Sequence, residues 1–207
     1  MIEVISLILP LASLIAVDFY SQKKDRFDYA VIAFLIATIF VETCSLVMSS
    51  FVDYSRQVLY NVYSLIVFLL FIKLFQSLIH ARRLKLIFKW APVVLIFIFI
   101  LDSVLNDNIT TALQILTYIS GAITLVSLVS AYLIQLLQSD QVIEFYISKH
   151  FWVSLGLLLF YIPFIPVIIC LNYALSDASL LLKIIIALNV IMHACFLIAY
   201  LWASKMK

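Results

Sequence analysis

The chain has 207 residues, of which 66% are hydrophobic and 12% are charged, and its formal net charge is +2. A soluble domain is about 45–50% apolar and about 25% charged, so this chain has too little polar surface to cover a water-soluble globule. The composition excludes a soluble enzyme, a nucleic-acid-binding protein and a disulfide-stapled secreted domain, and it predicts an all-α polytopic membrane protein.

Seven apolar segments follow one another along the chain, each bounded by charged or turn-forming residues. A helix that crosses the hydrocarbon core needs about 20 largely apolar residues, and the segments match that length. No connection is long and polar enough to fold in water, so residues 1–207 are predicted to form a single transmembrane domain. The predicted spans are 2–20, 28–50, 57–79, 87–105, 109–138, 147–173 and 179–203.

Basic residues are distributed unevenly between the two sets of connections. Because lysine and arginine are retained in cytoplasmic loops, the bias predicts a seven-helix bundle with the N-terminus outside and the C-terminus in the cytoplasm. The basic residues on the predicted cytoplasmic side are Lys23, Lys24, Arg26, Arg82, Arg83, Lys85, Lys89, Lys149, Lys205 and Lys207; the outer side has Arg56 and Lys183 with the acidic Asp53, Asp102, Asp107 and Asp177.

Glu42, in the second span, is the most informative polar residue of the apolar segments. Polar groups in hydrocarbon are costly and usually face the bundle interior. Glu42 is interpreted either as a ligand contact or proton-coupling group, or as a neutral carboxyl that is hydrogen-bonded to a neighbouring helix. Four residues of other spans lie at a similar depth, which suggests one site that opens to the outside. They are Asn61, Gln114, Tyr118 and Asn189.

The fifth span has a stripe of small and polar residues at three- and four-residue steps, which places them on one helix face. Such a face lets helices approach closely, so it is interpreted as a packing surface, with a cavity lining as the alternative. The stripe comprises Thr110, Gln114, Thr117, Gly121, Thr124, Ser127, Ala131 and Gln135.

Pro163 and Pro166 lie inside the sixth span. Each proline removes a backbone donor and crowds the preceding turn, so the span is predicted to bend or to unwind locally. Tyr161 or water would then satisfy the freed carbonyl groups. We interpret the two prolines either as a hinge that moves on ligand binding or as a static kink.

In the last span, Asn189 and His193 are four residues apart and share a face. His193 is interpreted as a hydrogen-bonded structural residue, with a ligand contact as the alternative. The predicted ligand-binding set is therefore Glu42, Asn61, Gln114, Tyr118, Tyr161, Asn189 and His193.

Two cytoplasmic features remain. Arg82, Arg83, Lys85 and Lys89 form a basic run that is expected either to contact an acidic partner or anionic lipid, or only to determine topology. The stretch 140–149 alternates polar and bulky apolar residues, which suits either a short interfacial helix or an extension of a neighbouring span.

Enzyme chemistry finds little support in the residues. Of the three histidines, His80 and His150 lie at predicted cytoplasmic helix ends and His193 lies nearer mid-membrane, and they show no metal-ligand spacing. Asp18, at the cytoplasmic end of the first span, could join His80 or His150. We therefore expect no catalytic residues, no metal and no cofactor. The three cysteines match no zinc or redox motif.

Three segments resemble a family of small, uncharacterised bacterial seven-helix membrane proteins. They are LYNVYS at 59–64, HFWVSLG at 150–156, and LNVIM at 188–192 followed by YLW at 200–202. The resemblance covers most of the chain from about residue 28 and supplies no catalytic residues. It implies a location in the bacterial inner membrane and, by analogy, a stand-alone sensing module.

The leading expectation is a non-enzymatic membrane sensor that binds a small or lipidic ligand in the outer half of the bundle. Its partners would be membrane lipids and a separate cytoplasmic signalling protein, with homo-oligomerisation as a further option and no nucleic acid. The alternatives are a small transporter or oligomeric pore, including a toxic or defence-related one, and an intramembrane lipid hydrolase.

Overall fold

The structure is a computed structural model that describes residues 2–21, 24–51, 57–105, 113–138, 148–173 and 177–201. These residues form helices and no strand, as the composition predicts. The predicted stretch 140–149 lies mostly outside them. The helices are α1 (Ile2–Tyr20), α2 (Arg26–Phe51), α3 (Gln57–Leu78), α4 (Arg82–Phe88), α5 (Ala91–Leu105), α6 (Ile115–Leu137), α7 (Lys149–Asn172) and α8 (Ala178–Leu201).

Six helical stretches are long and apolar enough to cross a membrane. They correspond to α2, α3, the α4–α5 stretch, α6, α7 and α8, whereas the stretch Ser6–Tyr20 of α1 is apolar but shorter. The prediction of an all-α integral membrane protein is confirmed to this extent. The seventh span and the orientation of the termini stay predictions.

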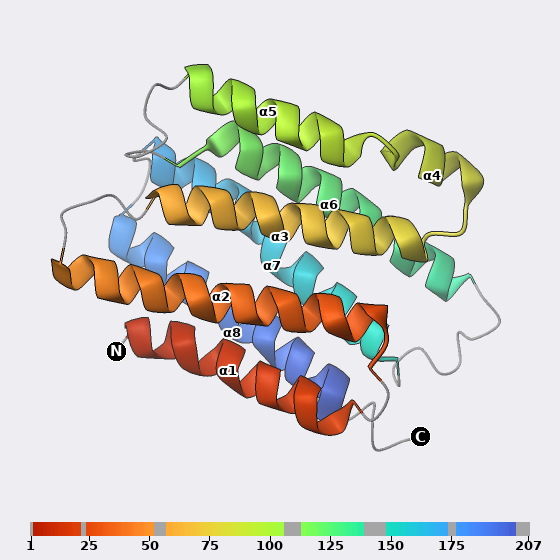
Figure 1. Ribbon diagram of the computed structural model, residues 1–207, viewed down its shortest axis with the longest axis horizontal. Coiled ribbons are helices and arrows are strands. Elements are labelled where there is room, and N and C mark those ends of the chain that lie inside the picture. The colour runs from red at the N-terminus through yellow and green to blue at the C-terminus, as the bar shows by residue number, and fades with distance from the viewer. Residues whose placement is uncertain are drawn as a thin grey trace.

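Six of the helices form a closed ring, and α5 lies outside it. Around the ring, α1 contacts α2, α2 contacts α3, α3 contacts α6, α6 contacts α7, α7 contacts α8, and α8 returns to α1. Helix α5 packs on α3 and α6, at one edge of the bundle (Figure 1). The fourth predicted span is therefore peripheral, and its side chains are largely exposed to the surroundings.

Phenylalanine side chains fill the centre of the ring. Phe34 lies 5.2 Å from Phe71 and 6.0 Å from Phe196, measured between ring centroids. Phe68 and Phe75 are as completely buried as these three. Because lipid tails are as apolar as these rings, close van der Waals packing is what holds the helices together here.

The fourth span differs from its prediction, which began at residue 87. Helix α4 already begins at Arg82, and the chain leaves the helix at Lys89 and Trp90 before α5 begins. Pro92 explains the break, because it has no N–H to donate to the Phe88 carbonyl one turn earlier. The Gln76 side chain of α3 donates to that carbonyl instead, at 2.5 Å.

The fifth span also begins later than predicted, at Ile115 rather than 109. Residues 113 and 114 precede the helix, and residues 109–112 lie outside the described part. The assignment of Asp102 to an outer connection is wrong: it lies within α5 and its side chain is fully buried. Its Oδ2 accepts the backbone N–H of Thr117 at 3.0 Å and so satisfies a donor in the first turn of α6.

Asp177 precedes α8 and caps it. The carboxyl accepts the backbone N–H of Ser179 at 2.9 Å and its hydroxyl at 2.8 Å. These two hydrogen bonds lower the pKa of the Asp177 carboxyl, because they stabilise its charged form. The acidic residue before the last span thus has a local structural role at the start of the helix.

Candidate functional site

The most densely connected polar group in the described residues is Asp28, whose side chain is fully buried near the start of α2. Its Oδ1 accepts the Tyr200 hydroxyl of α8 at 3.0 Å. Its Oδ2 accepts the Ser21 hydroxyl at 2.8 Å and the Lys149 ammonium of α7 at 2.6 Å. One carboxylate therefore joins the connection after α1 to the ends of three helices.

Asp25 forms an outer layer of the same cluster. Its Oδ2 lies 3.0 Å from Lys149 Nζ and 4.0 Å from His150 Nε2, and its Oδ1 accepts the backbone N–H of Asp28. Partial burial would by itself raise the pKa of the Asp25 carboxyl, but the Asp28 hydrogen bond and the Lys149 charge outweigh it and lower that pKa. Ser21, Asp25, Asp28, Lys149, His150 and Tyr200 are called the basic-end network below.

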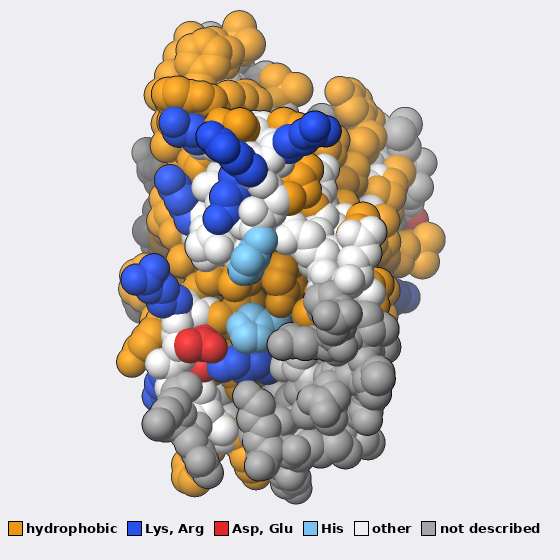
Figure 2. Space-filling view, turned by 90° about the vertical axis from the view of Figure 1, so that its right-hand side faces the viewer, with side chains coloured by type: hydrophobic (Ala, Val, Ile, Leu, Met, Phe, Trp, Pro, Cys, Tyr) orange, Lys and Arg blue, Asp and Glu red, His pale blue; other side chains and the backbone are white. Residues whose placement is uncertain are grey.

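The network lies at the end of the bundle that carries most of the basic side chains (Figure 2). A buried ion pair costs much desolvation energy, so it contributes little net stability, but removal of one partner leaves an uncompensated charge. The sequence prediction missed this network. The available signal was Asp28 itself, a carboxylate in the first turn of α2, and its partner Lys149 lies 121 positions later.

Glu42 is half-buried on α2, where it accepts a hydrogen bond from the Ser6 hydroxyl of α1 at 3.1 Å. It lies close enough to Tyr63 of α3 to interact with it electrostatically. Tyr63 shares a 2.7 Å hydrogen bond with Thr38, one helical turn before Glu42. The Glu42 carboxyl is thus hydrogen-bonded to a neighbouring helix, and its role in ligand binding stays a prediction.

Asn61 and Gln114 are brought together, as their similar predicted depth suggested. Asn61 Oδ1 accepts the backbone N–H of Gln114 at 3.1 Å, and both side chains are buried. The Gln114 amide donates to Ser103 of α5 at 2.5 Å. With Asp102, they form a polar cluster that joins α3 and α5 to the start of α6.

Tyr118 and Tyr161 lie against the same aromatic ring of α3. Both contact Phe68, with centroid distances of 5.6 Å and 5.4 Å, respectively. Tyr161 is close enough to Tyr63 and Tyr118 to interact with them electrostatically. Three hydroxyl-bearing rings from α3, α6 and α7 therefore gather in the bundle interior.

His193 and Asn189 have separate partners. His193 Nδ1 lies 2.9 Å from the Ser13 hydroxyl of α1, and both side chains are buried. Asn189 donates to the Ile185 carbonyl of its own helix. His193 therefore matches the interpretation as a hydrogen-bonded structural residue.

Helix α7 runs through Pro163 and Pro166 without interruption. The predicted local unwinding does not occur, so a bend remains the expected effect of the two prolines.

The polar stripe of the fifth span has mixed surroundings. Thr117 and Gly121 are buried, whereas Ser127 is exposed.

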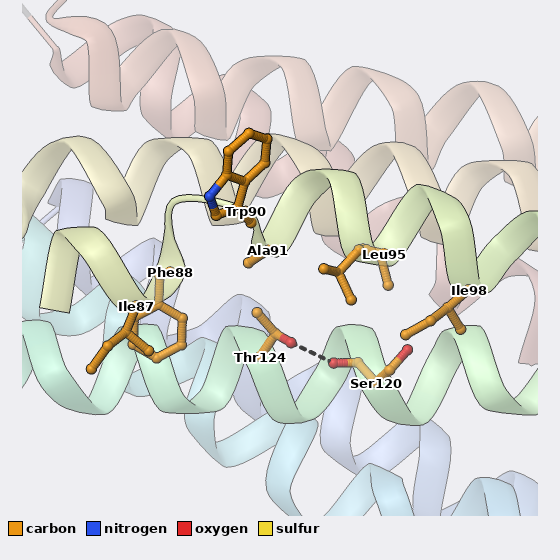
Figure 3. Close-up of a pocket in the computed structure, with 9 residues that line it drawn as sticks. Ile87, Phe88, Trp90, Ala91, Leu95, Ile98, Ser120 and Thr124 are labelled. Atoms are coloured by element: carbon orange, nitrogen blue, oxygen red, sulfur yellow. Dashed lines mark hydrogen bonds between the residues drawn. The ribbon is translucent and has the colours of Figure 1, made fainter.

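The structure has an open hollow of about 230 Å³ between the α4–α5 stretch and α6 (Figure 3). None of the seven predicted ligand-binding residues lines it. The hydroxyls of Ser120 and Thr124 are its main polar groups, and both donate to carbonyls of their own helix. The lining residues are Ile87, Phe88, Trp90, Ala91, Val94, Leu95, Ile98, Ser120 and Thr124.

The described part of the chain contains no group of three His, Cys, Asp or Glu side chains that could hold a metal ion. Asp18 pairs with Lys24, and His80 Nδ1 contacts the Leu78 carbonyl. Among the described residues, Asp18 belongs to no group of three such ligands.

Comparisons with protein-family models, with curated proteins and with solved structures gave no match. The resemblance to small seven-helix bacterial proteins therefore stays an expectation from the sequence.

Proposed function

We propose that the chain is a seven-helix integral membrane protein, with its N-terminus outside, that acts as a non-enzymatic sensor. The observation that supports this function is the course of α7. Its first residue, Lys149, belongs to the basic-end network, and Tyr161 lies among the interior tyrosines about three turns along the same helix. Pro163 lies two residues after Tyr161.

A ligand in the outer half of the bundle, near Glu42 and Tyr63, would act on this helix through Tyr161. The prolines weaken the backbone hydrogen bonding of α7, so its first half can tilt at low cost. A tilt would change the geometry between Lys149 and Asp28, which gives two states that a ligand can select. We propose that the chain lies in a bacterial inner membrane and that a separate cytoplasmic protein reads the change.

The ligand half of the proposal is tested by native mass spectrometry of protein purified in mild detergent. We expect a bound small molecule or lipid on the wild type that is lost in Glu42→Gln. Thr43→Ala is the matched control, because Thr43 is adjacent, exposed, and donates only to its own helix. Equal retention by both variants would remove Glu42 from the site.

Flux measurements separate the sensor from a transporter or pore. The ring centre is packed with phenylalanine in the described residues, so we expect liposomes with wild-type protein to show no ion flux above empty liposomes. Flux that is abolished by Glu42→Gln would overturn the sensor and favour a pore, either in one chain or between copies. Lipid turnover lost on His193→Ala would overturn it in favour of a hydrolase.

A further inference from the structure

The α4–α5 stretch combines two features at one place on the surface. Helix α4 has no buried residue and carries Arg82, Arg83 and Lys85, with Lys89 directly after it. The hollow between this stretch and α6 begins at Ile87 and runs along α5 to Ile98. A basic surface therefore adjoins an apolar hollow.

The basic side chains of this surface are available. Arg82, Arg83, Lys85 and Lys89 are exposed, and in the described part of the chain none of them has an acidic partner. The Lys89 ammonium lies 5.6 Å from the centre of the Trp90 ring, and Trp90 is 62% exposed. A tryptophan beside basic residues is typical of the headgroup region of a membrane.

The hollow itself is suited to a hydrocarbon chain. Between Ala91 and Ile98 it follows α5 for about 10 Å, at 1.5 Å per residue. Its two hydroxyl groups, on Ser120 and Thr124, are already hydrogen-bonded within α6. An apolar occupant therefore leaves no polar group of these two residues without a partner.

We propose that this surface binds one anionic phospholipid, with its phosphate on the basic side chains of α4 and one acyl chain in the hollow. Charge complementarity identifies the headgroup, because the four exposed cations of α4 and Lys89 have no acidic partner among the described residues and attract an anionic lipid surface. An acidic soluble protein would satisfy these charges but would leave Ile87, Trp90 and Val94 uncovered; they are 69%, 62% and 52% exposed.

The test compares phosphatidylglycerol with phosphatidylcholine of the same acyl chains by native mass spectrometry. The wild type should retain the anionic lipid preferentially, and 0.5 M salt should weaken that preference by screening. Arg82→Gln/Arg83→Gln should lower it about tenfold, since each basic residue near the surface contributes substantially to anionic-lipid binding. Equal retention of the two lipids by the wild type would overturn the proposal.

Two matched controls make the test specific. Lys73→Gln/Lys183→Gln also removes two exposed charges, but away from the hollow, and should keep the preference. An equal loss in both double variants would overturn the site, because it would indicate general charge attraction. The thermal unfolding midpoint of each variant confirms that the fold is retained.

The hollow is tested separately. Ser120→Leu should fill it and reduce retention of the anionic lipid, whereas Ser127→Leu, on the same helix but outside the hollow, should not. The same retention by these two variants would overturn the acyl-chain assignment. A different outcome is that the wild type forms dimers and that Ser120→Leu dissociates them. A second copy of the chain would then occupy the hollow, and this result would also overturn the acyl-chain assignment.

Discussion

Gly121 is one of two glycines in the chain, and it lies where α6 meets α3. A Cβ atom at this position would lie 2.5 Å from Cδ2 of Phe68, well inside van der Waals contact. Phe68 is 1% exposed and contacts Tyr118 and Tyr161, so its ring has little room to move. Gly121 therefore determines how closely the two helices pack.

We expect Gly121→Ala to lower the free energy of unfolding by up to about 2 kcal/mol. Overpacking costs about 1–3 kcal/mol, and the better helix propensity of alanine returns about 1 kcal/mol. Titration with SDS in mixed micelles measures the change, with Ser127→Ala on the exposed face as control. The combination with Phe68→Leu should be less destabilising than the sum of the single changes; strict additivity would contradict the argument.

Replacement of Lys149 and replacement of Asp28 are expected to lower the free energy of unfolding by different amounts. Lys149→Met leaves the fully buried Asp28 carboxylate without its cation and should cost about 2–4 kcal/mol of unfolding free energy. Asp28→Asn should cost less, because the Lys149 ammonium would still have an ionic partner in Asp25, whose Oδ2 lies 3.0 Å away. The same SDS titration measures both changes.

The pair between Lys24 and Asp18 is the control for this prediction. Its side chains are 29% and 64% exposed, and surface ion pairs contribute little to stability. Lys24→Met should therefore leave the unfolding curve unchanged. If Asp28→Asn were more damaging than Lys149→Met, the desolvated carboxylate would not be the dominant cost.

At the scale of elements, hydropathy predicted the course of the chain well but not the ends of every helix. The spans 2–20, 57–79 and 147–173 differ from α1, α3 and α7 by two residues at most. The late start of α6 depends on Asp102 and Asn61, which come from two other helices. The residue pattern around the start of α6 cannot indicate capping groups that belong to other helices.

Asp102 provides the test of this explanation. Asp102→Ala removes the acceptor for the N–H and hydroxyl of Thr117, so it should destabilise the fold by about 1–2 kcal/mol. Hydrogen exchange should quicken in the first turn of α6 and stay unchanged at its C-terminal end. Asp102→Asn keeps an acceptor oxygen and should show the smaller effect. Faster exchange along the whole helix would contradict a local capping role.

At the scale of the molecule, the order of helices around the ring was beyond the sequence. Charge and hydropathy identify spans, but shape decides which spans touch, as Gly121 and Phe68 show for α6 and α3. The candidate site had the same limit. Asn61 and Gln114 shared a depth and do meet, whereas Asp28 and Lys149 had no common pattern that could pair them.

The orientation of the whole bundle is the last prediction. Arg26, Arg82, Arg83, Lys85 and Lys149 all lie at one end, and the retention of basic residues predicts that this end faces the cytoplasm. Lys85 and Lys183 are exposed on α4 and α8, in segments assigned to opposite sides of the membrane. Each can be replaced by cysteine in a chain without Cys44, Cys170 and Cys195.

A membrane-impermeant maleimide should label Lys183→Cys in intact cells, and should label Lys85→Cys only after the membrane is permeabilised. The chain without cysteines is the control for background labelling. The reverse pattern would place the basic end outside, and both the proposed cytoplasmic output at the Asp28 network and the cytoplasmic location of α4 would then be wrong. The lipid site itself would survive that result, because its headgroup contacts depend on the charges of α4 and not on the side they face.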